Sequence, residues 1–200
     1  MNIKLRILAL FLFVGVRLAA QDLPASATDI SPLLIGERIP AISVTDVEGK
    51  TISLLQLASQ RQTILIFYRG GWCPYCNVHL GELQTIEKDI LSAGFQVVAI
   101  SPDSPDSLRS SVDKHDLNYM LLSDSDTHAS RAFGIAYAAP ERHYEKLMAY
   151  SAQENKGVLP VPSVFVTNKQ GEILFEYINP NYKTRISGPL LLAVLRELAE

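Results

Sequence analysis

The stretch that decides the fold is Thr63-Ile64-Leu65-Ile66-Phe67-Tyr68-Arg69-Gly70-Gly71-Trp72-Cys73-Pro74-Tyr75-Cys76. Residues 63–68 form an apolar, β-branched run of the kind that is buried on both faces in a central strand. Gly70 and Gly71 break the strand, and Pro74 suits the first position of a helix. The stretch therefore predicts a buried strand that leads into a helix beginning at the two cysteines.

Strand and helix signals alternate along the rest of the chain, which predicts an α/β layer fold. The predicted strands comprise a hairpin at 42–45 and 51–54, single strands at 63–68, 95–100 and 120–122, and a second hairpin at 163–167 and 173–177. The predicted helices lie at 74–93, 104–116, 127–133, 140–155 and 187–199. Segment 136–159 has no counterpart in this alternation, so we interpret it as a helical insert.

Length and composition exclude several classes of protein. The chain has 200 residues, 48% of them hydrophobic and 20% charged, which is typical of a folded globular domain. The formal net charge of -3 carries no basic excess, so a nucleic-acid partner is not expected. No cofactor is expected either, because the two cysteines can themselves be the redox group.

The N-terminus resembles an export signal. A short basic region with Lys4 and Arg6 precedes about ten apolar residues and then Ala19-Ala20. We expect a signal peptide at 1–20, a tether at 21–32 and one domain at 33–200, with a periplasmic or secreted location and no stable membrane insertion after cleavage. Cleavage would remove three basic residues, leaving 15 against 21 acidic ones and a net charge of -6.

The position of the dithiol predicts its chemistry. Cys73 stands at a helix N-terminus, where unpaired N–H groups and the helix dipole stabilise a thiolate. Cys76 lies one turn further along, on the apolar face of the helix, where it is placed to attack a sulfur bonded to Cys73. We therefore expect Cys73 to be the exposed nucleophile and Cys76 the shielded resolving thiol, with a redox-active disulfide between them.

Two other interpretations of the cysteines remain open. A purely structural disulfide would close a very short loop and contribute only about 2 kcal/mol in the chain-entropy model. A metal site with His79 as third ligand is disfavoured, because Cys73 and His79 lie roughly 120° apart around a helix. We expect His79 to be a polar residue at the edge of the apolar stripe.

The order of motifs resembles the thioredoxin superfamily, and more closely its alkyl hydroperoxide reductase/thiol-specific antioxidant branch, the peroxiredoxin-like proteins. The resemblance rests on the W-C-P-Y-C stretch after a strand, on Leu122-Ser123-Asp124 and Phe133-Gly134, and on Val161-Pro162 before the second hairpin. It implies a thioredoxin-like fold, with a central mixed sheet flanked by helices, an N-terminal hairpin and the helical insert.

The chain departs from this family at two positions. The Thr or Ser that peroxiredoxins carry three residues before their reactive cysteine is Gly70 here, and their active-site Arg is replaced by Pro162. In thioredoxins the position of Pro162 holds a cis-proline, so the resemblance implies a cis bond that presents backbone to the bound sulfur. It also implies that Trp72 and Tyr75 form an apolar rim. Arg69 is the cation nearest the thiols in sequence, and is either a substitute for the missing Arg or a solvated residue.

Three functional hypotheses follow. The first is a secreted thiol–disulfide oxidoreductase that exchanges with protein or small-molecule thiols and disulfides. The second is a thiol-dependent peroxidase in which Cys73 is oxidised by a hydroperoxide and Cys76 resolves the sulfenic acid, with an electron-donating thiol or thioredoxin-type protein as reductant. The third is a non-enzymatic copper-binding module that uses Cys73, Cys76 and a histidine.

Overall fold

The structure is a computed structural model, and it describes residues 23–115 and 117–199. The predicted signal peptide and the first two residues of the predicted tether lie outside the described residues. Within the described part, no helix is both long and apolar enough to span a membrane.

Strand β3 (Gln62–Phe67) is an interior strand of a seven-stranded sheet, and all six of its residues are buried. It pairs in parallel with β4 (Phe95–Ser101) and antiparallel with β8 (Ser163–Thr167). Burial of both faces explains why β3 reads as a continuous apolar run rather than as an alternating one. The strand predicted at 63–68 is confirmed.

The sheet extends on both sides of these three strands in the order β2-β1-β5-β4-β3-β8-β9. Strand β5 is parallel to β4, and the pairings of β1 with β5, β1 with β2 and β8 with β9 are antiparallel, so the sheet is mixed as predicted. The bounds are β1 Ser43–Thr45, β2 Thr51–Ser53, β5 Met120–Ser123 and β9 Ile173–Ile178.

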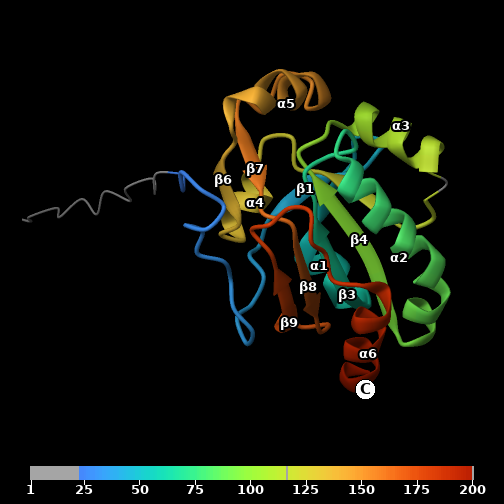
Figure 1. Cartoon of the computed structure of the whole chain (residues 1–200). Helices are drawn as coiled ribbons and strands as arrows, with labels where there is room; N and C mark the ends of the chain where they lie inside the picture. Colours follow the sequence, from blue (N-terminus) through green and yellow to red (C-terminus); the bar gives the residue numbers. More distant parts are fainter. Residues whose placement is uncertain (1–22, 116, 200) are drawn as a thin grey trace, which may run out of the picture.

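Helices cover both faces of the sheet (Figure 1). Ile64 and Ile66 pack in a cluster with α2 (Pro74–Ser92) and α6 (Gly188–Leu198), whereas Leu65 and Phe67 pack in the cluster on the opposite face. That second face is covered by α1 (Leu54–Gln60) and α4 (His128–Ala132). Helix α3 (Pro105–His115) contributes Leu108 to the first cluster. The predicted fold, a thioredoxin-like α/β architecture, is confirmed.

The insert differs from the single helix predicted at 140–155. It contains a 3-10 turn (Glu141–His143) and the short helix α5 (Tyr144–Tyr150). Strands β6 (Ala136–Ala138) and β7 (Val158–Pro160) pair antiparallel at its base. Sequence periodicity missed these strands because each has only three residues and its partner lies about twenty positions away. Helix α1 was missed for a similar reason, since its seven residues are too few to establish a period.

Residues 23–32, expected to be a tether, contact the domain. The Pro24 carbonyl accepts a hydrogen bond from the Ala138 N–H at 2.8 Å, and Ala27 and Ile30 pack against the apolar cluster of the insert.

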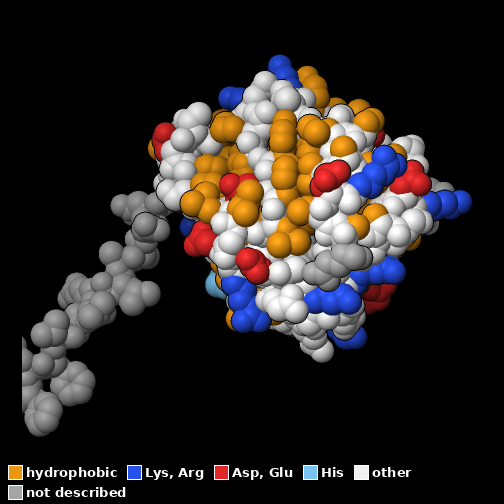
Figure 2. All heavy atoms as spheres, turned by 90° about the horizontal axis from the view of Figure 1, so that it is seen from below, with side chains coloured by type: hydrophobic (Ala, Val, Ile, Leu, Met, Phe, Trp, Pro, Cys, Tyr) orange, Lys and Arg blue, Asp and Glu red, His pale blue; other side chains and the backbone are white. Residues whose placement is uncertain are grey.

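Figure 2 shows hydrophobic side chains gathered on the face seen from below. This is the end of the molecule at which α6 terminates (Figure 1).

Candidate active site

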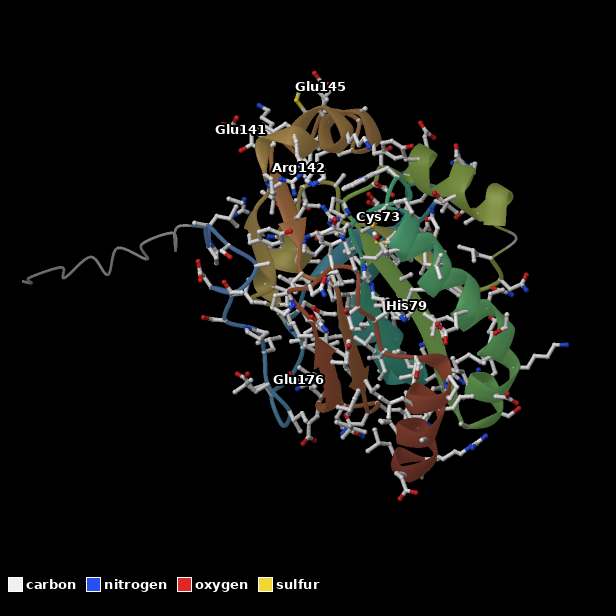
Figure 3. The ribbon with its side chains drawn as sticks, in the orientation of Figure 1. Cys73, His79, Glu141, Arg142, Glu145 and Glu176 are labelled. Atoms are coloured by element: carbon white, nitrogen blue, oxygen red, sulfur yellow. The ribbon has the colours of Figure 1, made fainter. Side chains whose placement is uncertain are left out.

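Cys73 lies where the sequence places it, at the N-cap of α2 with Pro74 in the first turn. Its N–H donates to the Gly70 carbonyl at 3.1 Å, and its own carbonyl accepts from the Cys76 and Asn77 N–H groups at 3.0 and 3.1 Å. These bonds close the turn between β3 and α2 and fix the position of the thiol at the carboxyl end of β3. Figure 3 shows Cys73 at the head of the helix and His79 further along it.

The Cys73 thiol is acidic but not exposed. Its pKa is lowered to about 6, first by a hydrogen bond from the Cys76 side chain, then by the Cys76 backbone N–H and by the charges of two arginines, Arg69 and Arg185. These effects outweigh burial, which raises the pKa. The residue is only 1% exposed, so the prediction of an exposed nucleophile is wrong. Cys73 belongs to a buried apolar cluster against which Trp72 packs.

Cys76 is the partner that stays protonated. Both cysteines are free thiols in this structure, and Cys76 is buried within the first turns of α2. Burial raises the pKa of Cys76 well above its usual value, and the neighbouring Cys73 raises it further. The Cys76 thiol can therefore donate to a Cys73 thiolate and remain available to attack it after oxidation.

Arg185 is a site residue that the sequence analysis missed. It precedes α6, and its Nη2 lies 3.5 Å from the Cys76 sulfur. Its Nη1 donates to the Thr184 carbonyl at 3.0 Å and to the Tyr182 carbonyl. No local pattern in the sequence marks Arg185, because only the packing of α6 against α2 brings it to the thiols.

Arg69 is not the solvated residue that one interpretation expected, since it is only 3% exposed. Its guanidinium carbon lies 5.0 Å from the centre of the Trp72 ring and 4.1 Å from that of the Tyr182 ring. Its Nη2 lies 3.1 Å from Nε2 of His143 in the insert. Because an arginine can only donate, this His143 nitrogen is the acceptor.

Trp72 and Tyr75 both lie beside the dithiol. Trp72 is half-buried and packs against the cluster that contains Cys73, and its ring lies 5.3 Å from that of His143 in the insert, centre to centre. Tyr75 is 42% exposed and meets Tyr182 edge to face at 5.7 Å. Arg69 connects the two pairs of rings, since its guanidinium lies over both Trp72 and Tyr182.

Pro162 does not carry the implied cis bond. The described residues contain no cis peptide bond, so the Val161–Pro162 bond is trans, which is the intrinsic preference of X–Pro bonds. The Pro162 carbonyl accepts from the Asn179 N–H at 3.3 Å, and the Val161 N–H donates to Ile135 at 2.8 Å. The backbone there is engaged in holding β8 and the insert, which argues against a role in presenting backbone to a substrate.

Asp103 is a second residue that the sequence analysis missed. It is 1% exposed, and its Oδ2 accepts a hydrogen bond from the Gly71 N–H at 2.6 Å. Burial raises the pKa of Asp103 to about 7, and the charge of Cys73 adds to the shift. The sequence did contain a signal for this position. Cys73 follows β3 and Asp103 follows β4, and the residues that follow two parallel neighbouring strands lie at the same edge of the sheet.

The position of the missing family hydroxyl has no room for a side chain. Gly70 has a φ of +127°, and a Cβ built there would lie 2.6 Å from both Oδ1 of Asp103 and Nε1 of Trp72. A threonine or serine at this position would displace both groups. The turn therefore requires glycine, and any polarisation of a bound oxidant has to come from other residues.

His79 is buried, not at a polar edge. It is 3% exposed, and burial, followed by the charge of Arg185, lowers its pKa to about 4. A neutral, buried imidazole fits a packing role between α2 and the segment before α6. Within the described residues, no three His, Cys, Asp or Glu side chains come together as a metal site would require.

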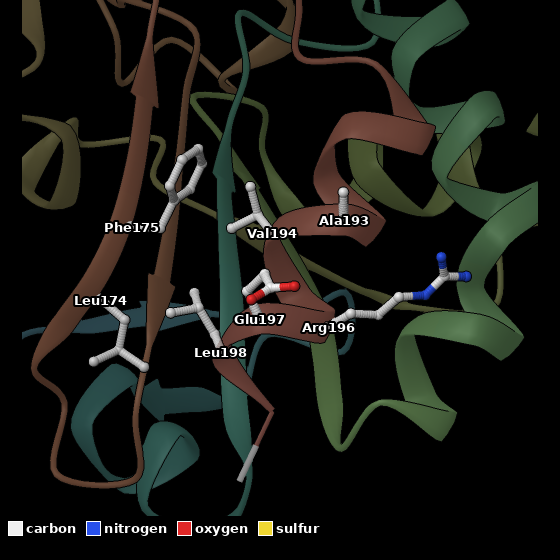
Figure 4. A pocket seen from close by; sticks show the side chains of 7 residues that line it. All are labelled: Leu174, Phe175, Ala193, Val194, Arg196, Glu197 and Leu198. Carbon is white, nitrogen blue, oxygen red and sulfur yellow. The ribbon is translucent and has the colours of Figure 1, made fainter.

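A pocket elsewhere is not part of this site. It lies between β9 and α6 and is lined by Leu174, Phe175, Ala193, Val194, Arg196, Glu197 and Leu198 (Figure 4). The lining is mostly apolar and contains no thiol. It lies toward the C-terminal end of α6, whereas Cys73 lies at the opposite end of the sheet.

The family assignment rests on the sequence as a whole. Residues 35–175, more than half of the chain, match the AhpC/TSA family. The chain belongs to this family. The resemblance stated from the motifs is thus confirmed, and so is the assignment as a thiol-dependent oxidoreductase. Within the AhpC/TSA family, a putative peroxiredoxin of Mycobacterium tuberculosis is 30% identical over 152 residues, which cover 76% of this chain and 89% of that protein.

Two further proteins are similar to this chain, one in sequence and one in structure. A thiol-disulfide oxidoreductase, ResA, of Bacillus thuringiensis is 21% identical over 163 residues, covering 81% of this chain and 80% of that protein. Among solved structures, reduced Prx3 of Vibrio vulnificus in complex with hydrogen peroxide superposes with a TM-score of 0.70 at 13% identity, covering 82% of this chain and 99% of that one. The second likeness concerns the fold alone.

Proposed function

We propose that this AhpC/TSA protein is a thiol-dependent peroxidase in which Cys73 reacts with hydroperoxides and Cys76 resolves the product. The observation that carries the proposal is a thiol with a pKa of about 6 that is only 1% exposed and is flanked by two arginines. A small hydroperoxide needs little opening to reach this sulfur. A protein disulfide must bring its own backbone against the thiolate, so it would have to displace the side chains that bury Cys73. We therefore place the peroxidase hypothesis ahead of disulfide exchange, which the sequence analysis had put first.

The proposed reaction consumes one hydroperoxide and the two thiols, and it forms an alcohol, water and a disulfide. The Cys73 thiolate attacks the terminal peroxide oxygen, the O–O bond breaks, and an alcohol leaves after taking up one proton. Cys73 then carries a sulfenic acid. The Cys76 thiol attacks that sulfur, releases water and leaves the Cys73–Cys76 disulfide. Two electrons from an external thiol, either a small molecule or a thioredoxin-type protein, regenerate the dithiol.

The arginines take the place of the absent hydroxyl. Arg185 lies 3.5 Å from the Cys76 sulfur, and the charges of Arg69 and Arg185 both lower the pKa of Cys73. The leaving alkoxide is also an anion, so a guanidinium at this position would stabilise the transition state by charge-assisted hydrogen bonding. The likeness to a putative peroxiredoxin supports the peroxidase function as a whole.

Disulfide exchange is the second candidate, and it is favoured by the spacing of the thiols. Two cysteines on one helical turn form a disulfide without unfolding the helix, which suits rapid exchange. Gly70 replaces the family hydroxyl, and the likeness to a thiol-disulfide oxidoreductase agrees with this candidate.

Stopped-flow oxidation of the reduced chain separates the two candidates. The chain has one tryptophan, Trp72, which lies beside the dithiol and reports its state. Hydrogen peroxide should oxidise Cys73 at least a hundredfold faster than it oxidises a free thiol, and C76S should accumulate a sulfenic acid. Slow oxidation by peroxide together with fast reaction with a small disulfide would assign exchange instead. In that case C76S would trap mixed disulfides.

We also propose that the chain is exported to the periplasm or secreted. The proposal is supported by the basic, apolar and small-residue regions of positions 1–20. Mass spectrometry of the expressed protein in cytoplasmic and exported fractions tests it. Recovery of a chain beginning at Gln21 in the exported fraction is expected, and a full-length chain confined to the cytoplasm would refute export.

A further inference from the structure

Positively charged side chains gather around the dithiol from three separate parts of the chain. We call this set the basic rim; its members are Arg69, Arg142, Lys146, Lys183 and Arg185. Arg69 precedes the dithiol, two members belong to the insert, and two lie in the segment between β9 and α6. The hydroperoxide reaction itself needs a cation only at the sulfur, so the outer members require another explanation.

The insert supplies one side of the basic rim. The Lys146 Nζ lies 5.7 Å from the centre of the Trp72 ring. His143, on which Trp72 packs, lies 3.1 Å from Nη2 of Arg69, and burial, and then the charges of Arg69, Arg142 and Lys146, lower its pKa. His143 therefore stays neutral and adds no charge.

The segment before α6 supplies the opposite side. The Lys183 Nζ lies 5.9 Å from the Tyr75 ring centre and 6.0 Å from that of Tyr182. Lys183 is exposed, and the rings beneath it are partly exposed. A ligand on this surface would meet apolar ring faces below and an ammonium group at its edge.

Acidic side chains offset the rim only in part: Asp103, which accepts from the Gly71 N–H, adds one negative charge when it is ionised, against the five cations of the rim. Segments 68–79 and 179–187 contain no Asp or Glu. Over the described ranges, the one ion pair within 4 Å is Arg109–Asp106, on α3. Glu141 and Glu145 belong to the insert, but in Figure 3 they lie on its outer side, with Arg142 between them and Cys73. Since the whole chain has a net charge of -3, this local excess of positive charge is specific to the site.

We infer that the basic rim binds the carboxylate of an organic hydroperoxide while the peroxide end reaches Cys73. The inference rests on the proposed peroxidase function and names its substrate class. The body of the substrate lies over Tyr75 and Tyr182, and its carboxylate pairs with Lys183 or with Lys146 and Arg142. The carboxylate is unchanged in the reaction, in which only the peroxide O–O bond breaks and the thiols supply the two electrons.

The test compares a carboxylate-bearing organic hydroperoxide with its own methyl ester, which differs only in the charge. Oxidation of the reduced full chain is followed by Trp72 fluorescence at pH 8, where Cys73 is ionised. The carboxylate should react about fivefold faster than the ester, a preference in keeping with two exposed ion pairs. The preference should fall in 0.5 M salt. It should also fall toward unity in K146Q/K183Q and fall part of the way in K183Q alone. It should persist in K169Q, the one-charge control for K183Q, which removes a lysine from the exposed β8–β9 turn at the far end of the sheet.

The substrate class and the peroxidase function would be overturned by different results. Equal rates for the carboxylate and the ester, with fast oxidation by hydrogen peroxide, would overturn the substrate class and leave the peroxidase function intact. Slow oxidation by all three peroxides would overturn the peroxidase function. The rim is then tested by binding of the hydroxy acid with the same skeleton, again by Trp72 fluorescence. Tighter binding than that of its methyl ester is expected, and equal binding would overturn the rim as a carboxylate site.

Discussion

The guanidinium of Arg185 reaches the sulfur of Cys76 at 3.5 Å, although the two residues are 109 positions apart in sequence. This contact joins the head of α2 to the segment before α6. It places a permanent positive charge beside a pair of thiols that share one negative charge when Cys73 ionises. The acidity of Cys73 is therefore a property of the packed helices as well as of the helix N-terminus.

Replacing Arg185 should raise the pKa of Cys73. In R185Q the coulombic stabilisation of the thiolate is lost, and we expect an upward shift of roughly one unit. Thiolate absorbance or alkylation rate against pH measures the shift. Peroxide oxidation at pH 7 should slow about twofold from the smaller thiolate fraction alone, and further to the extent that Arg185 stabilises the leaving alkoxide. R196Q, which removes an exposed arginine near the other end of α6, is the matched control. An unchanged titration in R185Q would mean that this contact does not act on Cys73.

The hydrogen bond between the thiols should be separable from the resolving reaction. The Cys76 side chain is the largest influence that lowers the pKa of Cys73. C76S keeps a hydroxyl donor and C76A removes it, so the pKa of Cys73 should be higher in C76A than in C76S. Both variants lack the resolving thiol, which makes each the control for the other. Identical titration curves would contradict the donor role of Cys76.

Asp103 should make stability depend on pH. Its pKa is raised from 3.8 to about 7 in the folded chain, so the folded state binds the proton more tightly than the unfolded state. The favourable contribution is complete below pH 4 and is lost as the pH rises through 7. D103N keeps an oxygen that can accept from Gly71 and does not titrate. Chemical denaturation gives the free energy of unfolding of both proteins. Relative to the parent chain, that of D103N should rise by on the order of 1 kcal/mol per pH unit between pH 4 and 7. Above pH 7 the difference between the two should stay constant. A difference that does not vary with pH would show that Asp103 titrates normally.

Two glycines of the same region should respond in opposite ways to alanine. Gly70 has a φ of +127° and no space for a Cβ, so G70A should destabilise the fold by about 1–3 kcal/mol. It should also disturb the Gly71–Asp103 hydrogen bond. Gly81 lies within α2, where a Cβ would meet nothing within 4 Å, so G81A should stabilise by about 0.5–1 kcal/mol. Thermal melts of both variants measure the contrast, and a neutral G70A would show that the turn can rearrange.

Local sequence was sufficient for the sheet and for the site of chemistry. The apolar run of β3 and the final helix from Ser187 follow from hydrophobic patterning and capping signals that act within a few residues. The insert was less predictable, because β6 and β7 are short strands that exist only through pairing with each other.

The sequence by itself determined that a pair of cysteines stands at a strand–helix junction, since the strand, the glycine turn, Pro74 and the cysteine spacing are all local. It did not determine how deeply Cys73 and His79 are buried, or which charges reach the thiols. Tertiary packing decided those, by bringing Asp103 from the end of the neighbouring strand and Arg185 from beyond the sheet. The physical reason is that burial and coulombic interaction depend on distance in space, and the sheet brings together residues that no sequence pattern connects.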